Sequence, residues 1–192
     1  MKRCWKNPPK IKIYEALGCL ADNRLVTTES GATVWSSSRN KSYIVKFDQT
    51  SGAIMANDNG SYWQDYLGYP AIAYLINCGM LPYNKKFAAA LRSIPWKSVN
   101  QINNNDFEKS LAQIHQALTS SGFDVSALIE HIDLVSKQIE KLNVKKLGEK
   151  IEPPTEKSTK WHYLKEMPRW PKAFLLQDRE NHKRELVVFA IL

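Results

Sequence analysis

Residues 42–80 constrain the fold of this chain more than any other segment. They contain a β-prone run, a turn with Gly52, a second β-prone run, an aromatic loop and an apolar helix that opens at Pro70. Proline suits the first turn of a helix, because its missing N–H has no partner there in any case. A ββα unit of this size needs either a metal site or a neighbouring core to hold it.

The segments around this unit predict an antiparallel sheet with one buried helix. Glu29-Ser30-Gly31 is typical of a hairpin turn, and the alternation of apolar residues on either side indicates strands. We expect four strands, at residues 24–28, 32–36, 41–47 and 53–57. Residues 71–76 are apolar on nearly every side, which predicts a central buried helix that stops at Gly79.

The remaining pattern is helical and then polar. Apolar residues at helical spacing predict helices at 11–21 and 84–94 and a helical hairpin at 101–142. The second arm of the hairpin carries a seam of apolar residues, namely Val125, Leu128, Ile132, Val135, Ile139 and Leu142. Residues 145–160 are rich in Lys, Glu and Pro and indicate an exposed linker. The apolar run 186–192 predicts a strand docked on the sheet.

These patterns together predict an α+β protein, with a small antiparallel β meander packed on a central helix. A helical hairpin and a basic C-terminal extension follow it. We expect three segments: an α+β domain at 1–100 with its ββα core at 42–80, the hairpin at 101–142 packed on it, and the linker and tail at 143–192.

The charge of the chain favours an acidic partner. The formal net charge is +8, and residues 1–12 hold five basic side chains without an acid. Such a balance favours nucleic acid. No run approaches the roughly 18 apolar residues of a membrane-spanning helix, so no membrane partner is expected. Three widely spaced cysteines fit a reducing, cytoplasmic location, and we expect Cys19 and Cys78 to be buried.

Aromatic side chains beside basic ones are the candidate binding residues. Trp63 lies in a loop with four aromatics in nine residues, and it either forms a recognition surface or covers the Pro70 helix. Trp5 and Trp170 lie in basic segments, where each either latches a tail or stacks on a ligand. The candidate nucleic-acid-binding set is Lys2, Arg3, Trp5, Lys6, Lys10, Trp63, Lys165, Arg169, Trp170 and Lys172.

Motifs for catalysis or cofactor binding do not occur in this sequence. The four histidines are scattered, and no G-x-S-x-G elbow or glycine-rich phosphate loop is present. Asn57-Asp58-Asn59-Gly60 begins like a calcium loop, but no glutamate closes it at position twelve, so a turn is expected. We therefore expect no catalytic residue, no metal and no cofactor.

The order strand–strand–loop–helix in residues 42–76 resembles the SWIM zinc-finger family. In that family a Cys-x-Cys follows the second strand and a Cys-x-His opens the helix. Asn57-Asp58-Asn59 and Gly68-Tyr69-Pro70 take these places here, and Ala73 lies where a helical alanine is common. The resemblance implies a degenerate, zinc-independent unit and a DNA- or protein-binding role.

Three functions remain open at this point. The first is a non-catalytic interaction module that binds nucleic acid through basic arms and aromatic side chains. The second is a protein–protein assembly subunit or homo-oligomer that uses the seam of residues 124–142. The third is an enzyme with an unfamiliar site near residues 57–69.

Overall fold

The computed structural model describes residues 4–155, 176–177 and 184–185. The chain forms two compact units. Unit 1 comprises Met1–Ile94 with Ala127–Lys157, and unit 2 comprises Pro95–Ser126 with Ser158–Leu192. This division differs from the expected segments, because most of the second hairpin arm belongs with the sheet and the first arm does not.

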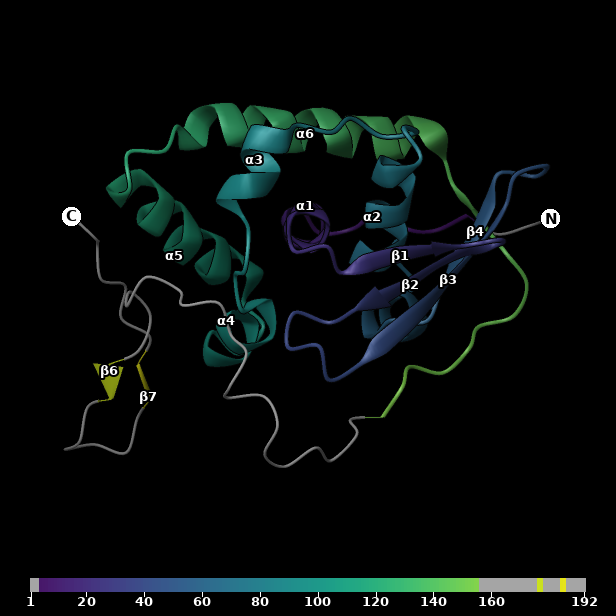
Figure 1. Ribbon diagram of the computed structural model, residues 1–192, viewed down its shortest axis with the longest axis horizontal. Coiled ribbons are helices and arrows are strands. Elements are labelled where there is room, and N and C mark those ends of the chain that lie inside the picture. Colours follow the sequence, from purple (N-terminus) through teal and green to yellow (C-terminus); the bar gives the residue numbers. More distant parts are fainter. Residues whose placement is uncertain (1–3, 156–175, 178–183, 186–192) are drawn as a thin grey trace. The chain divides into compact units, whose positions relative to one another are not determined.

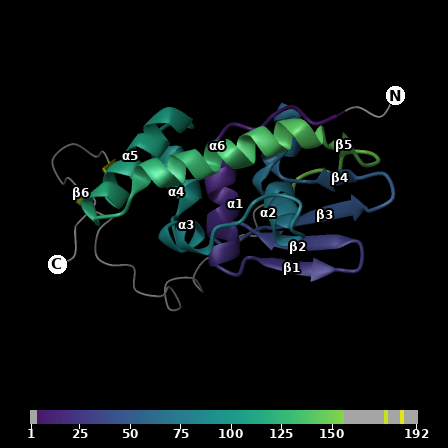
Figure 2. The same cartoon turned by 90° about the horizontal axis from the view of Figure 1, so that it is seen from above.

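Unit 1 contains a five-stranded sheet whose strands lie in the order β1 to β5 (Figure 2). The first four strands pair antiparallel, as the predicted meander requires. Their bounds are Leu25–Thr28, Gly31–Trp35, Ser42–Asp48 and Ala53–Ala56. The fifth strand, β5 (Lys145–Lys146), runs parallel to β4 and pairs Lys145 with Ala53. This strand comes from the segment that was expected to be a linker.

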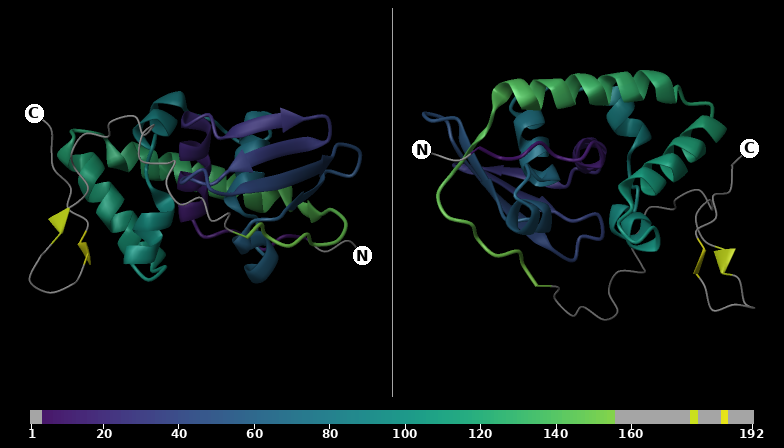
Figure 3. Two further views of the ribbon diagram at one scale, coloured as in Figure 1. Left: turned by 60° about the horizontal axis from the view of Figure 1, so that its bottom comes forward. Right: turned by 180° about the vertical axis from the view of Figure 1, so that it is seen from behind.

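Helix α2 (Tyr69–Asn77) lies against one face of the sheet, where it contacts β1 to β4, and α1 (Ile11–Ala21) packs against α2 (Figures 1 and 3). Val34 and Val45 are buried on that face, whereas Ile44 on the opposite face is 43% exposed. The alternation along β2 and β3 therefore places one apolar row on the face that α2 covers. The expected α+β architecture is confirmed.

Helix α2 is the buried centre of unit 1. All residues from Pro70 to Ile76 are buried, as predicted. The helix ends where Gly79 adopts φ +73° and Met80 N–H donates to the Leu75 carbonyl at 2.9 Å. The prediction for Cys78 was wrong: its thiol is exposed, because this residue caps the helix beyond the buried stripe. Cys19, within α1, is buried as expected.

The long helix α6 (Val125–Leu142) covers part of unit 1 with its apolar seam. The ring of His131 lies 5.2 Å from that of Phe87 on the short helix α3 (Lys85–Ala90). The seam residues Leu128, Ile132, Val135 and Ile139 are at most 4% exposed. The centre of the seam is therefore already buried within the chain, which counts against its use for assembly, the second of the three functions.

Unit 2 contains α4 (Trp96–Ile102) and α5 (Phe107–Ser120), with the short strands β6 (Leu176–Gln177) and β7 (Arg184–Glu185). Asp106 caps α5, where its side chain accepts from Lys109 N–H. Trp96 follows the helix predicted at 84–94, is buried and begins α4, and no helix was predicted at residues 96–100. The strand predicted at 186–192 lies outside the described residues. Within the described ranges, every helix is too short or too polar to cross a bilayer.

Candidate functional site

The loop between β4 and α2 is fixed by a buried group of hydrogen bonds around Asp58. One carboxylate oxygen accepts from Gly60 N–H at 3.0 Å and Ser61 N–H at 3.3 Å, and the other accepts from Ser61 Oγ at 2.6 Å. Ser61 Oγ in turn accepts from Gly68 N–H at 3.1 Å. These bonds, which we call the Asp58 knot, tie the start of the loop to the start of α2.

Two glycines allow the knot to close. A Cβ atom on Gly68 would overlap the Asp58 carboxylate, and one on Gly60 would overlap the ring of Tyr66. Burial raises the pKa of Asp58, while the bonds from Ser61, the positive charge of Lys12 and the bond from Gly60 oppose that rise.

A buried ion pair lies near the knot. Lys12 Nζ is 2.7 Å from Glu15 Oε1, and both side chains are at least 88% buried. Burial lowers the pKa of Lys12, but the charges of Glu15, Tyr66 and Asp58 outweigh it, and the net shift is upward. Lys12 therefore remains charged at neutral pH. Asp58 and Asp65, the charged groups of residues 57–69, each have a partner that fixes their position. An enzyme site near these residues would therefore have to use the same groups that hold the loop in place.

Trp63 is presented to solvent by this fixed loop. It lies in a single π-helical turn, η1 (Gly60–Gln64), whose first two residues, Gly60 and Ser61, belong to the knot. The side chain is 68% exposed and stands edge-on to Tyr62, with ring centroids 4.6 Å apart. Of its two predicted roles, covering the Pro70 helix is excluded by this exposure. Turns of π-helix occur frequently at functional sites.

Lysines surround the base of the loop. Asp65, which has φ +67°, is ion-paired with Lys146 and Lys150. These two lysines lower the pKa of Asp65 to about 2. Lys150 Nζ also donates to the Tyr62 carbonyl at 2.9 Å, so a lysine lies directly beside the aromatic pair. Lys6 is exposed, and its backbone pairs with the loop at Asp65 and Leu67.

Of the predicted binding set, the structure describes Trp5, Lys6, Lys10 and Trp63. Trp5 was wrongly included, because it is 8% exposed and its Nε1–H donates to the Ile54 carbonyl at 3.0 Å. It acts as a latch, the other role expected for it. Lys10 is ion-paired with Asp133 at 2.6 Å. Six members of the set lie outside the described residues: Lys2, Arg3, Lys165, Arg169, Trp170 and Lys172.

The sequence did not indicate Lys146 and Lys150 as site residues, because a segment rich in Lys, Glu and Pro resembles any exposed linker. Ser61 was missed too, although Asp58 and Ser61 have the three-residue spacing of a side-chain cap. Within the described part of the chain, no three His, Cys, Asp or Glu side chains gather as a metal site would require.

The fold and the loop define an α+β protein in which a hydrogen-bonded knot presents an exposed tryptophan beside lysines. The chain belongs to the family described as uncharacterised conserved protein UCP014422, whose family model matches residues 5–145. That match includes the knot and Trp63. No curated protein and no solved structure matches the chain.

Proposed function

We propose that this protein is a non-catalytic interaction module that binds nucleic acid, with Trp63 as a base-stacking side chain. The observation that carries the proposal is that the side chain of Trp63 is 68% exposed on a loop that the Asp58 knot holds in place. An exposed large aromatic on a preformed loop loses little conformational freedom on binding. Stacking of a base on such a ring contributes about 1–3 kcal/mol.

The charges near the loop support the same partner. The formal net charge of the chain is +8, and the exposed Lys6 and Lys150 lie at the base of the loop. Lysines positioned beside a stacking ring can contact the phosphates on either side of a stacked base. Single strands are favoured over duplex, because only unpaired bases offer a free face to Trp63.

The proposal includes the resemblance to SWIM-type units. In such a unit zinc joins the end of the second strand to the start of the helix. Here the Asp58 knot joins the same two places, from Asp58 through Ser61 to Gly68. We infer that hydrogen bonds and packing take over the joining role of the metal, while the binding role of the unit is retained.

The test measures binding of fluorescent 12-nucleotide DNA and RNA single strands, and of the matching duplex, as a function of salt. We expect Trp63→Ala to weaken single-strand binding about 5- to 100-fold. We expect a smaller effect on duplex. Trp63→Phe, which keeps an aromatic face, is the matched control and should retain most of the affinity.

Two results would count against the proposal. One is single-strand binding that Trp63→Ala leaves unchanged. The other is a wild-type protein that binds none of the three probes at low salt, where electrostatic binding is strongest. Because Trp63 is exposed, its replacement should leave the melting temperature unaltered, so loss of binding cannot be attributed to unfolding.

A further inference from the structure

A second cluster of charge lies at the C-terminal end of α1, and the proposed function does not use it. Arg92 Nε donates to the Ala21 carbonyl at 3.1 Å, and an Nη of Arg39 donates to the Asp22 carbonyl at 2.9 Å. The two arginines reach the helix end from different loops, one after α3 and one between β2 and β3. The partial negative charge of a helix C-terminus attracts both.

The charges of this cluster do not cancel. Asp22 is its one carboxylate among the described residues, and this group is occupied by Arg24, whose Nε lies 3.2 Å from Oδ2. Asp22 Oδ1 also accepts from Ser93 N–H. Arg39 and Arg92 form no ion pair with any residue in the described ranges, so three arginines face one carboxylate.

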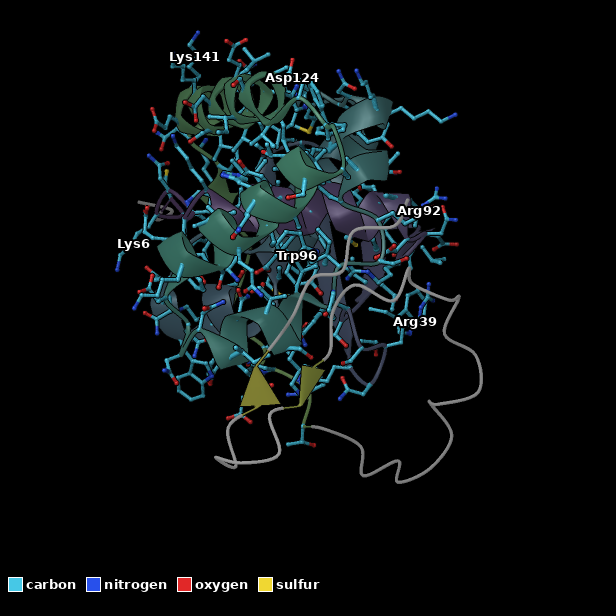
Figure 4. The ribbon with its side chains drawn as sticks, turned by 90° about the vertical axis from the view of Figure 1, so that its left-hand side faces the viewer. Lys6, Arg39, Arg92, Trp96, Asp124 and Lys141 are labelled. Carbon is cyan, nitrogen blue, oxygen red and sulfur yellow. The ribbon has the colours of Figure 1, made fainter. Side chains whose placement is uncertain are left out.

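The two outer arginines are accessible. Arg39 and Arg92 are both exposed, and Figure 4 shows them on the same side of unit 1, with Lys6 on the opposite side. Each guanidinium has five N–H donors and uses one of them on a helix carbonyl in the hydrogen bonds described above. The hydrogen bond to the helix carbonyl therefore leaves most N–H donors of each guanidinium group available.

The arginine from the β2–β3 loop is held in place by its own loop. Arg39 has φ +55°, and its N–H donates to the Ser36 carbonyl at 2.9 Å. Ser36 Oγ donates to Asn40 Oδ1 at 3.1 Å across the same loop. No acid occurs between Gly31 and Phe47, so no carboxylate of that stretch competes for the guanidinium.

We propose that Arg39 and Arg92 form a phosphate-binding clamp at the end of α1. A tetrahedral oxyanion accepts several N–H bonds at once, and two arginines fixed on adjacent carbonyls present donors for such a group. The ligand is a phosphate group, which is either a free phosphate or a phosphate of a nucleic-acid backbone. The clamp stands independently of Trp63.

The test measures the affinity of the full chain for inorganic phosphate and for a phosphodiester oligonucleotide. Amide chemical-shift changes follow the first ligand and fluorescence anisotropy follows the second. We expect Arg39→Gln with Arg92→Gln to weaken phosphate binding at least about tenfold. The matched control is Lys85→Gln with Lys137→Gln, which removes the same charge from exposed positions of unit 1.

Arg39→Lys with Arg92→Lys provides a variant that keeps the charge and one donor for each carbonyl. We expect it to fold as the wild type does and still to bind phosphate more weakly, because lysine lacks the two-pronged geometry. A role limited to capping the helix would leave phosphate affinity unchanged in this variant and would overturn the proposal.

The two ligands distinguish the source of the phosphate. Arginine-dependent binding of inorganic phosphate that the oligonucleotide does not displace assigns the clamp to free phosphate. Arginine-dependent binding of the oligonucleotide assigns it to a backbone. Two results would refute the clamp: phosphate binding that Lys85→Gln with Lys137→Gln weakens as much as Arg39→Gln with Arg92→Gln does, or a wild type that binds neither ligand. Trp63→Ala should leave phosphate binding unaltered, so failure of the proposed function and failure of the clamp are separable.

Discussion

Gly68 lies against the Asp58 carboxylate, and this contact leaves no room for a side chain. Its φ of −73° is available to any residue, so the requirement for glycine is steric. Gly79 is different: it has φ +73° and open space around its Cβ position, so its requirement is set by the backbone.

We predict that Gly68→Ala destabilises unit 1 by about 1–3 kcal/mol, as overpacking in a closed site does. In the background of Asp58→Ala the same change should be nearly neutral, because the overlap is gone. Gly79→Ala is the control, with a backbone cost of about 1–2 kcal/mol that Asp58→Ala does not alter. Urea unfolding of the three single variants and the two double variants measures these terms, and additive costs at positions 58 and 68 would contradict the knot.

Asp65 should make the stability of the fold depend on pH in the acid range. Its pKa is about 2 in the folded chain, because Lys146 and Lys150 hold the charged form, and about 3.9 when unfolded. The ion pairs therefore stabilise the fold fully above about pH 4, and this contribution is lost as the pH falls toward about 2. Asp58 has the opposite sign, since burial raises its pKa and favours the folded state at low pH.

We predict that Asp65→Asn makes the melting temperature fall less than in the wild type between about pH 5 and pH 2. Thermal unfolding followed by circular dichroism at several pH values measures the difference. Glu130→Gln, at an exposed position of α6, removes a carboxylate without touching these lysines and should keep the wild-type profile. Coincident profiles for Asp65→Asn and wild type would show that the ion pairs contribute nothing.

The tryptophans show what a sequence can predict at the scale of single residues. Trp5 and Trp63 both occur among polar neighbours, and local pattern does not separate them. One is buried because its indole N–H reaches the Ile54 carbonyl, 49 residues away in the sequence. The other is exposed because the Asp58 knot directs its loop outward. Both reasons are tertiary, so they could not be inferred from spacing.

At the scale of elements, the spacing of apolar residues predicted the helices and strands that carry a regular apolar pattern. The strands β1 to β4 and the helices α1, α2, α5 and α6 lie within a few residues of their expected positions. β5 was missed, because two lysines carry no apolar alternation and the strand is defined only by its partner β4. α4 was missed because Pro95 follows the helix predicted at 84–94, and proline commonly follows a helix end; proline also precedes and opens helices, as it does here.

Helix α2 is the element on which unit 1 depends most. We predict that Ile72→Ala or Leu75→Ala destabilises unit 1 by about 2–5 kcal/mol, because both side chains are fully buried. Val26→Ala, at a position 53% exposed on β1, should change stability by less than about 0.5 kcal/mol. Chemical denaturation gives both values. A cost for Ile72→Ala no larger than that for Val26→Ala would place α2 outside the core.

At the scale of the whole molecule, Trp5 joins parts of the chain that are distant in sequence. Its N–H donates to the Val144 carbonyl, and its indole N–H donates to the Ile54 carbonyl, each at 3.0 Å. Lys146 Nζ lies 5.0 Å from the centre of the same ring. The N-terminal segment, β4 and β5 therefore share one buried side chain.

We predict that Trp5→Ala costs about 3–5 kcal/mol and speeds hydrogen exchange at Leu147 N–H, which donates to Ile54. Trp63→Ala is the matched control, since it removes the same side chain from an exposed position. It should leave both the stability and the exchange rate as they are. Exchange at Leu147 that is equally slow in both variants would show that Trp5 does not hold β5.

The parallel pairing of β4 with β5 affects how the protein folds while the ribosome synthesises it. Lys145 follows its partner Ala53 by 92 residues, so β4 is made long before the strand that covers its edge. At about 5–20 residues per second, that edge stays open for roughly 5–20 s. An open edge is a template for pairing with another chain. Slower translation of residues 57–145 should therefore lower the yield of folded protein, and a chaperone that covers β4 during this interval should restore it.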